Sequence, residues 1–350
     1  MAKVVVGMSG GIDSTLTAFK LKEEGYEVVG ATLYMWDTPS ITKAVEDAKK
    51  QAVKLGIQHY TIDCRTEFKN SIVNRFVDNY LSGETPSPCA WCNPIIKWNK
   101  LEDLANTIGA EYIASGHYIQ TIEYNGIKYI QKGVDELKDQ SYYMWMLKEK
   151  TIRRMLQPLG GMLKEETKQL ITTHNLKSVV PTKESMSICF LGGTNYRDFL
   201  AGIAPDKLER IQPGKVYDED GTEIGTHNGI PYYTIGQKRG LNLNIEREAY
   251  VSKIDAIHNS IYITTKKGLE RMEFEIKEVN LLNPSEINPT TALEVKVRGY
   301  GLNPNGFGYL SMGSNGKGTI RLEEPAWAIS PGQPVVLYIN GRLVGGGFAQ

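Results

Sequence analysis

A short apolar run followed by two adjacent glycines near the start of the chain constrains the fold more than any other stretch. Residues 4–6 are three valines, which predict a short buried strand. Gly10 and Gly11 can adopt backbone conformations that other residues rarely take, and Asp13 and Ser14 stand where a helix can begin. Because N–H groups in such a turn and at a helix N-terminus attract anions, we expect the phosphates of a nucleotide to bind here.

The turn lacks the lysine that a Walker A loop places before its Ser or Thr. It resembles instead the SGGxDS pyrophosphate loop of enzymes that cleave ATP between its α and β phosphates. The resemblance implies that the loop holds the departing pyrophosphate and that Asp13 helps to hold Mg²⁺. An ordinary strand–turn–helix that binds nothing is the alternative. The residues implied to bind ATP are Gly7, Met8, Ser9, Gly10, Gly11, Ile12, Asp13 and Ser14.

Length and composition exclude several broad classes of protein. A chain of 350 residues predicts two or three domains. Lys and Arg together number 40, as do Asp and Glu, so the chain is not a globally basic nucleic-acid binder, although a local basic patch is not excluded. No apolar run is long enough to cross a membrane or to form a signal peptide. The 4 cysteines argue against a disulfide scaffold and point to metal binding or catalysis.

Strand and helix patterns alternate over roughly the first third of the chain. After the strand at 4–6, strands are expected at 26–36, 57–62 and 112–114. Helices are expected at 16–24, 44–55, 66–80 and 101–108, whereas three prolines predict a loop at 83–94. This alternation predicts an α/β domain with a doubly wound parallel sheet. Ligands bind such sheets beyond the carboxyl ends of the strands, where the 7–14 turn, the segment after Thr32 and Gly116-His117 fall.

The later part of the chain has a different pattern. Asn125-Gly126 predicts a hairpin. Residues 151–176 are expected to be mostly helical, with an interruption at Pro158 and at Gly160-Gly161. Beyond about residue 200, turn dipeptides such as Asp220-Gly221 separate short alternating apolar runs. We therefore expect three domains: the parallel-sheet domain at 1–200, a small β-rich central domain at 201–268 and a C-terminal β-barrel at 269–350.

Three of the cysteines could carry chemistry. Cys89 and Cys92 form a CxxC pair on the proline-rich segment, which can chelate metal, cycle as a dithiol or place one thiolate beside a second residue. Cys64 ends a predicted strand, so we interpret it as a buried small hydrophobe rather than as a fourth zinc ligand. Cys189, taken alone, would be interpreted as a core thiol. Its candidacy as a functional cysteine comes from the sequence of the segment around it.

Segments along nearly the whole chain resemble, in their order, those of the bacterial tRNA-specific 2-thiouridylases. One segment alone would be weak, whereas the ordered set is specific. The resemblance implies an N-terminal domain of the adenine-nucleotide α-hydrolase type. The first segments are Gly-Met-Ser-Gly-Gly-Ile-Asp-Ser at 7–14, Thr-Pro-Ser-Pro-Cys at 85–89, Cys-Asn at 92–93, Ile-Lys-Trp at 96–98, Ala-Ser-Gly-His-Tyr at 114–118, Lys-Asp-Gln-Ser-Tyr at 138–142 and Ile-Cys-Phe-Leu at 188–191. The others are Tyr-Arg-Asp-Phe at 196–199, Gly-Thr-His-Asn-Gly-Ile at 225–230, Tyr-Thr-Ile-Gly-Gln-Lys-Arg-Gly-Leu at 233–241, Pro-Gly-Gln at 331–333 and Gly-Gly-Gly at 345–347.

The resemblance implies an ATP-dependent 2-thiolation of the wobble uridine, position 34, of tRNA. ATP binds at 7–14, with Leu33 and Gly116 flanking the nucleotide, and the uridine O2 attacks the α-phosphate so that pyrophosphate leaves. A persulfide on Cys189 then supplies sulfur to C2. Cys92 is the nucleophile that frees this sulfur, which leaves a Cys92–Cys189 disulfide to be reduced. The chemistry favours this division, because a thiolate is the nucleophile and a persulfide is more acidic than a thiol.

One position departs from the family pattern. Three residues before the nucleophile, many members carry an Asp that has been suggested as a general base, whereas this chain has Cys89. Cys89, Cys92 and Cys189 could instead supply three thiolates to a [4Fe-4S] cluster, with one iron left open to bind sulfide. The sequence leaves both the persulfide route and the cluster route open.

Other residues carried over from the family face the RNA. Without the resemblance, we would interpret the Lys-Asp-Gln turn at 138–140 as a solvated loop and His117 as a core histidine. Chemistry at C2 requires the uridine to leave its stack, and basic side chains predict salt-sensitive binding. Tyr300 follows where the family often has an aromatic residue one position earlier. The expected contacts are Ser87, Pro88 and Cys89 around the target base, His117 and Gln333 near the flipped base, and Lys138, Asp139, Gln140, Arg298 and Gly299 along the tRNA.

Several alternatives share the nucleotide loop. GMP, NAD, argininosuccinate and lysidine synthetases use related loops, but nothing in their chemistry calls for these cysteines. A sulfur transferase that makes 4-thiouridine or 2-thiocytidine is the nearest rival, and a non-catalytic RNA-binding protein is the alternative from another class. The resemblance also implies a cytoplasmic enzyme without a membrane partner. It implies that the enzyme binds the anticodon arm of Lys, Glu and Gln tRNAs and receives sulfur from a cysteine desulfurase or a relay protein.

Overall fold

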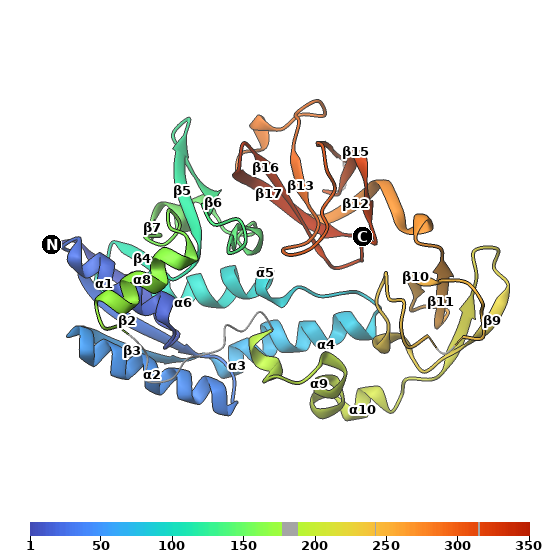
Figure 1. The fold of residues 1–350 in the computed structure, drawn as a ribbon, viewed down its shortest axis with the longest axis horizontal. Coiled ribbons are helices and arrows are strands. Elements are labelled where there is room, and N and C mark those ends of the chain that lie inside the picture. Colours follow the sequence, from blue (N-terminus) through green and yellow to red (C-terminus); the bar gives the residue numbers. More distant parts are fainter. Residues whose placement is uncertain (177–187, 242, 314–315) are drawn as a thin grey trace. The chain divides into compact units, whose positions relative to one another are not determined.

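The computed structural model describes residues 1–176, 188–241, 243–313 and 316–350. The chain forms two compact units, whose elements are labelled in Figure 1. The first unit consists of residues 1–72, 89–192 and 339–344. The second consists of residues 73–88, 193–338 and 345–350.

The first unit is built on a five-stranded sheet with the strand order β3-β2-β1-β4-β7. Strand β1 pairs in parallel with β2 on one side and with β4 on the other, so that Val5 lies opposite both Val29 and Ile113. This confirms the predicted parallel sheet. Strand β7 has only two residues and is too short to leave a periodic pattern in the sequence. The strands are β1 (Lys3–Gly7), β2 (Glu27–Tyr34), β3 (Gln58–Asp63), β4 (Tyr112–Ser115) and β7 (Met155–Leu156).

Helices cover both faces of this sheet. Helices α1, α2 and α8 pack on the face that carries Val4 and Val6. Helix α6 packs on the other face, where a Cβ added to Gly7 would lie 3.2 Å from a methyl carbon of Leu101. Since alternate residues of a strand point to opposite faces, β1 is buried on both sides, as a doubly wound sheet requires. These helices are α1 (Ile12–Glu23), α2 (Pro39–Leu55), α6 (Trp98–Ile108) and α8 (Lys164–Thr173).

The loop predicted at 83–94 is wrong for its second half. Residues 88–97 form α5 (Pro88–Cys92) and a π-helical turn, η2 (Asn93–Lys97), which leads directly into α6. Pro88 is the first residue of α5, where a missing N–H costs no hydrogen bond within the helix. Pro94 lies in the π-helical turn, where regular α-helical bonding is already interrupted. Proline therefore marks the start of a helix here and a change in its winding.

Three other expectations had mixed outcomes. The helix expected at 66–80 is confirmed as α3 (Arg65–Phe68), the π-helical turn η1 (Lys69–Val73) and α4 (Asn74–Leu81). The hairpin is confirmed by β5 (Ile119–Tyr124) and β6 (Ile127–Lys132), with Asn125 and Gly126 at positive φ between them. The expected interruption of 151–176 at Pro158 and Gly160-Gly161 is confirmed, but the break is longer than expected, because β7 and turns separate α7 (Glu149–Arg153) from α8. A Cβ at Gly160 would lie 1.8 Å from the carbonyl oxygen of Ile119, so this segment packs as bare backbone.

The second unit is mostly β-structure, as expected beyond residue 200. Two short helices, α9 (Tyr196–Ile203) and α10 (Pro205–Leu208), precede a four-stranded sheet of order β10-β11-β8-β9. A further sheet has the order β13-β16-β17-β12-β15-β14. The strands are β8 (Gly214–Tyr217), β9 (Glu223–His227), β10 (Tyr250–Asp255), β11 (Ser260–Thr264), β12 (Glu270–Leu281), β13 (Glu294–Lys296), β14 (Gly308–Met312), β15 (Gly318–Trp327), β16 (Pro334–Ile339) and β17 (Arg342–Ala349).

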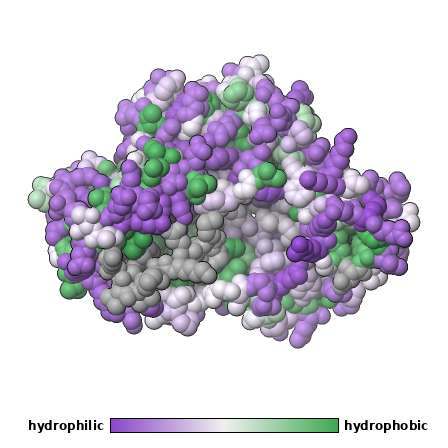
Figure 2. Space-filling model, in the orientation of Figure 1, coloured by the Kyte–Doolittle hydropathy of each residue, from purple (hydrophilic) through white to green (hydrophobic). Residues whose placement is uncertain are grey.

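The surface carries single apolar side chains among many polar ones. Figure 2 shows a face on which hydrophilic residues predominate. Isolated exposed residues such as Leu137 and Ile257 are normal for a folded chain. No helix in the described part of the chain combines the length and the apolar character that crossing a membrane would need.

Candidate active site

The nucleotide loop lies at the carboxyl end of β1 and leads into α1. Gly10 has a φ of 73°, and a Cβ there would lie 2.5 Å from the carbonyl oxygen of Ala44, so only glycine fits. Gly11 is extended instead, with a φ of −82°, and serves as the N-cap of α1. Positive φ is therefore required at one of the two glycines and not at both.

The Ser14 side chain stabilises this loop by hydrogen bonds to other residues of the loop. The Ser14 hydroxyl donates to the Gly11 carbonyl at 3.1 Å and accepts from the Ser9 N–H at 3.1 Å. No side chain caps α1, so the N–H groups of its first turn have no partner of that kind. An uncapped helix N-terminus beside a glycine turn is suited to binding phosphate groups.

Asp13 lies in a network that includes a lysine from α8. Lys164 Nζ is 2.7 Å from both carboxylate oxygens of Asp13, and the Tyr118 hydroxyl donates to one of them at 2.9 Å. The Tyr118 hydroxyl is also 2.9 Å from the Thr167 hydroxyl. Sequence reasoning missed Lys164. The available signal was a lysine as the first residue of a helix, where the helix dipole disfavours a cation.

The two residues expected to flank the nucleotide also lie at this edge of the sheet. A Cβ at Gly116 would lie 2.8 Å from the Ser14 nitrogen, so the backbone after β4 packs directly on the loop. Leu33 follows Thr32 in β2, and the Thr32 hydroxyl donates to the Met8 carbonyl at 2.8 Å. Leu33 lies in β2 and Gly116 directly follows β4, the two strands that pair with β1, and their contact with a nucleotide stays a prediction.

The cysteines lie on two short helical segments of the first unit. Cys89 and the buried Cys92 belong to α5, while the exposed Cys189 begins the 3-10 turn η4 (Cys189–Leu191). All are free thiols in this structure. Burial, together with smaller contributions from the thiols of Cys189, Cys89 and Cys64, raises the pKa of Cys92 to about 12, although the charge of Lys97 lowers it.

Lys97, the last residue of η2, is the cation that lowers the pKa of Cys89, Cys92 and Cys189. Its positive charge opposes the upward shifts in the pKa of Cys92, Cys89 and Cys189. Burial lowers the pKa of Lys97, but the charges of the same three thiols raise it more, so the net shift is upward. The net shifts keep these thiols protonated at neutral pH, and Lys97 is the cation that would stabilise a thiolate once one forms.

Cys64 is a core thiol, as interpreted from the sequence. It is buried, and its Sγ donates to the Tyr34 carbonyl at 3.6 Å. Burial raises its pKa to about 11. The thiol is therefore protonated and held by the backbone.

Cysteine thiolates are the usual ligands of iron–sulfur clusters, but they must also lie close enough together to bind one. Among the described residues, no three Cys, His, Asp or Glu side chains are grouped so that they could hold a metal ion. The exposed Cys189 and the two cysteines of α5 thus do not form a ready ligand set for a cluster. Asp13 differs, because a lone carboxylate at a phosphate site suits Mg²⁺, which keeps several water ligands.

Three family models match the chain in succession. They are described as a tRNA methyl transferase HUP domain at 2–193, a tRNA methyl transferase PRC-barrel domain at 197–265 and an aminomethyltransferase beta-barrel domain at 271–349. The tRNA-specific 2-thiouridylase MnmA 3 of Bacteroides fragilis is 38% identical over 348 residues, which is 99% of this chain and 93% of that protein. The MnmA of Rickettsia typhi is 38% identical over 359 residues, or 99% and 98% of the two chains.

This chain belongs to the tRNA-specific 2-thiouridylase family. Its fold is that of the family, with a HUP domain on a parallel sheet followed by two β-domains. The fold class expected from the sequence is therefore confirmed. The domain boundaries at 200 and 268 stay a prediction.

The turn at residues 138–140, which is expected to contact tRNA, is stabilised by hydrogen bonds within the protein. Asp139 is buried, and its carboxylate accepts from the Gly133 N–H, the Ser141 N–H and the Ser141 hydroxyl. The side-chain amide oxygen of Gln140, Oε1, accepts from the Tyr118 N–H at 3.0 Å. Lys138 is half-buried at the same turn. Of the three side chains, Asp139 and Gln140 shape the turn that carries Lys138.

His117 lies beside the first residue of α6, Trp98. Its Nδ1 is 2.7 Å from the Ser115 hydroxyl, and its ring centroid is 5.9 Å from that of Trp98. Burial, and then the charge of Lys97, lowers the pKa of His117 to about 3. The ring is therefore neutral near pH 7 and can hydrogen-bond to a base without adding charge.

Two predicted tRNA contacts in the second unit are engaged in internal bonds. The Arg298 guanidinium donates to the carbonyls of Trp327 and Ala328 at 2.8 and 2.7 Å. Gln333 is buried, donates to the Val297 carbonyl and accepts from the Ser330 N–H. The remaining contacts of this prediction vary in exposure: Ser87 and Gly299 are half-buried and Pro88 is buried.

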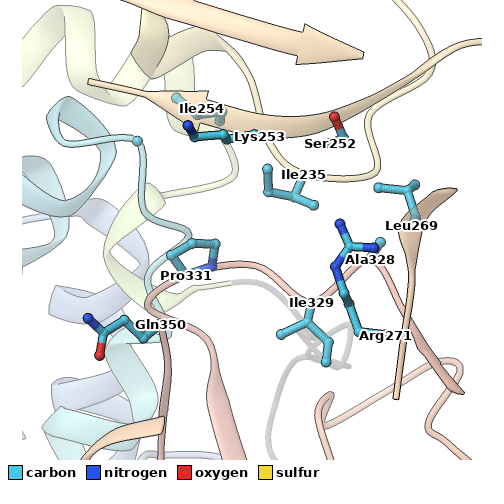
Figure 3. A pocket seen from close by; sticks show the side chains of 11 residues that line it. Ile235, Ser252, Lys253, Ile254, Leu269, Arg271, Ala328, Ile329, Pro331 and Gln350 are labelled. Carbon is cyan, nitrogen blue, oxygen red and sulfur yellow. The ribbon is translucent and has the colours of Figure 1, made fainter. Parts of the chain in front are cut away.

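The second unit also contains a cavity of about 180 Å³. Figure 3 shows Ile235 and Ser252 to Ile254 on one side and Arg271, Ala328 and Ile329 on the other. Arg271 donates to the carbonyls of Gly268 and Glu270, so its charge is already engaged. The described residues predicted to bind ATP, tRNA or metal do not line this cavity.

Proposed function

We propose that this protein is an ATP-dependent tRNA 2-thiouridylase that thiolates C2 of the wobble uridine, position 34. The proposal rests above all on the family of the chain, whose members match it over nearly its whole length. The uncapped nucleotide loop at the end of β1, with Lys164 beside Asp13, and the presence of Cys92 and Cys189 in the same unit support the same function.

The first step would take place at the nucleotide loop. The first-turn N–H groups of α1 and the ammonium of Lys164 would bind the phosphates of ATP, while Asp13 would hold Mg²⁺. The metal would offset phosphate charge as the uridine O2 attacks the α-phosphate. Pyrophosphate leaves, and the uridine O2 carries AMP. Lys164 is placed to remain with the negative charge that develops on the leaving group.

The second step would transfer sulfur. The terminal sulfur of a Cys189 persulfide attacks C2 and displaces AMP, which leaves a disulfide between the base and Cys189. The Cys92 thiolate then attacks Cys189 Sγ. The S–S bond to the base breaks, its electron pair stays on the sulfur of 2-thiouridine, and a Cys92–Cys189 disulfide forms. An external thiol reductant supplies two electrons and two protons to restore both thiols.

The second step requires Cys92 to lose a proton. With its pKa near 12, the thiol is protonated in the free enzyme at neutral pH. Lys97 is the cation that favours the thiolate. The mechanism therefore assigns activation of Cys92 to the tRNA-bound state, in which the reacting groups are assembled.

The partners of the enzyme follow from this chemistry. The substrate would be the anticodon arm of Lys, Glu and Gln tRNAs, gripped near Ser87 to Cys89 and at the turn that carries Lys138. The sulfur would come from a cysteine desulfurase, directly or through a relay protein. A cytoplasmic location fits a tRNA substrate and a reducible disulfide.

Two measurements test this function. Nucleosides from tRNA of a strain that lacks the gene, analysed by mass spectrometry, should lack 2-thiouridine derivatives, and the intact gene should restore them. Loss of 4-thiouridine or 2-thiocytidine instead would assign the enzyme to another base. The purified full-length enzyme should release pyrophosphate from ATP only when tRNA is present. Binding of tRNA without such release would identify an RNA-binding protein without this activity.

A further inference from the structure

The residue after Cys189 is buried in an aromatic contact. Cys189 is exposed, whereas the side chain of Phe190 is only 2% exposed. The Phe190 ring meets Phe68 edge to face, with a centroid distance of 5.6 Å and an interplanar angle of 71°. Phe68 is itself 1% exposed. This geometry is favoured between aromatic rings and fixes their relative orientation.

The contact continues to the nucleotide edge of the sheet. The ring of Trp36 lies 6.3 Å from that of Phe68. Trp36 follows the carboxyl end of β2, and Phe68 ends α3, which follows the carboxyl end of β3. A Cβ at Gly192 would lie 3.6 Å from the methyl carbon of Thr38, so the chain after Phe190 also runs along this edge. These contacts attach the η4 turn to the edge at which ligands bind in such sheets.

We propose that Phe190 is a positioning residue for sulfur transfer, because its buried ring holds the neighbouring Cys189 at the edge where the activated base would lie. The inference rests on the proposed role of Cys189 as the sulfur carrier. Cys189 must stay exposed to accept sulfur and must also reach both C2 and Cys92. A residue one position away can fix the backbone without covering the thiol.

The experiment uses the full-length enzyme with three substitutions. Phe190→Ala removes the ring, and Phe190→Leu keeps much of its apolar volume. Phe19→Ala is the control, since it removes a half-buried phenylalanine of the same unit whose ring packs against His174 at 4.6 Å. Tests are made at a temperature at which all variants are folded by circular dichroism.

Three rates are measured for each variant. The first is tRNA-dependent pyrophosphate release. The second is thiolation in a single turnover by enzyme already carrying persulfide sulfur. The third is formation of the Cys92–Cys189 disulfide in the free enzyme by the azo oxidant diamide, which takes two electrons and two protons from the two thiols. Mass spectrometry identifies the linked peptides.

Phe190→Ala should lower thiolation and disulfide formation at least tenfold while pyrophosphate release stays within about twofold. Phe190→Leu should fall between that variant and the wild type, and Phe19→Ala should change all rates in parallel. Wild-type thiolation by Phe190→Ala, or an equal loss of pyrophosphate release, would overturn the assignment. A separate variant, Cys189→Ser with Phe190 intact, tests the proposed function itself. If Cys189 is not the sulfur carrier, this variant would still thiolate tRNA.

Discussion

The ammonium of Lys164 lies 2.7 Å from both carboxylate oxygens of Asp13, in the turn expected to hold the phosphates of ATP. The Lys164 side chain is only 8% exposed, whereas that of Asp13 is 30% exposed. A Walker A loop carries its lysine within the turn itself. Here the cation comes from α8, 151 residues later in the chain.

Lys164→Met should lower tRNA-dependent pyrophosphate release at least 100-fold, because a single preorganised group at a site of developing charge contributes about that much. Removing one partner of a buried ion pair also destabilises the fold, here by about 2 kcal/mol, since solvent around Asp13 reduces the penalty. Pyrophosphate release and urea unfolding measure the two effects. Lys168→Met is the matched control, because Lys168 is an exposed lysine of the same helix, 3.5 Å from Glu165. Wild-type release by Lys164→Met would show that the ion pair is structural only.

Substitution of Cys189 and substitution of Cys92 should stop the reaction at different steps, so that different reaction species accumulate in the two variants. Cys189→Ser should abolish thiolation and leave pyrophosphate release detectable. Cys92→Ser should stop the reaction one step later, because the sulfur that joins C2 to Cys189 is then not released. A covalent enzyme–tRNA complex should appear on a denaturing gel and disappear on treatment with dithiothreitol. Loss of both steps in Cys189→Ser, or the same complex in Cys189→Ser, would contradict the division of roles.

Alkylation of the free enzyme should report the raised pKa of Cys92. Because that pKa is about 12, the thiolate fraction rises about tenfold per pH unit below it. We expect iodoacetamide to modify the exposed Cys189 first and Cys92 slowly, with the Cys92 rate rising about tenfold per unit between about pH 8 and pH 10. Lys97→Met should slow Cys92 further, since it removes the cation that favours the thiolate. Lys100→Met, which removes a cation paired with Glu67, should leave Cys92 unchanged.

The same pKa also affects stability at alkaline pH. The unfolded chain loses a cysteine proton near pH 8.5, whereas the folded protein keeps the Cys92 proton to about pH 12. The folded state therefore binds more protons in this interval. The contribution of Cys92 to the free energy of unfolding should be complete below about pH 8.5 and decline as the pH rises from there towards 12. Urea unfolding of the wild type and of Cys92→Ala across this range would show a steeper decline for the wild type.

The metal content of the enzyme distinguishes the two sulfur routes. The described cysteines do not form a ready ligand set, so enzyme purified anaerobically should be colourless and should thiolate tRNA when supplied with a persulfide donor. Cys89→Ser should keep most of the activity, because Cys89 has no step in the persulfide route and serine is close to cysteine in size at its expected place beside the target base. Stoichiometric iron and sulfide, lost together with activity in Cys89→Ser, would favour the cluster route instead.

The features predicted correctly from the sequence depend on local patterns, and those missed depend on packing between distant segments. The valines of β1 and the glycine turn predict the loop because strand, turn and helix each leave a local signature. Lys164 leaves only the weak signal of a lysine at a helix start, and the burial of Phe190 leaves none, because the contacts of both residues form only when α8 lies against α1 and η4 against α3. Gln333 is the reverse case. A family motif marks it as an RNA contact, which stays a prediction, and only the structure shows that its amide is buried and bonded within the second unit.

Salt dependence should separate Lys138 from Arg298, although both are carried over as tRNA contacts. Lys138 lies on a turn whose shape Asp139 and Gln140 maintain, so Lys138→Ala should weaken tRNA binding. It should also lower the slope of log K against log salt by about one, as expected for the loss of one phosphate contact. The Arg298 guanidinium bonds to two carbonyls and lies 5.9 Å from the Trp327 ring, so Arg298→Ala should reduce stability and leave the slope unchanged. Filter binding over a range of salt concentrations measures the slopes, and urea unfolding measures stability. An unchanged slope for Lys138→Ala, or a reduced slope for Arg298→Ala at full stability, would reverse the assignment of which cation meets the RNA backbone.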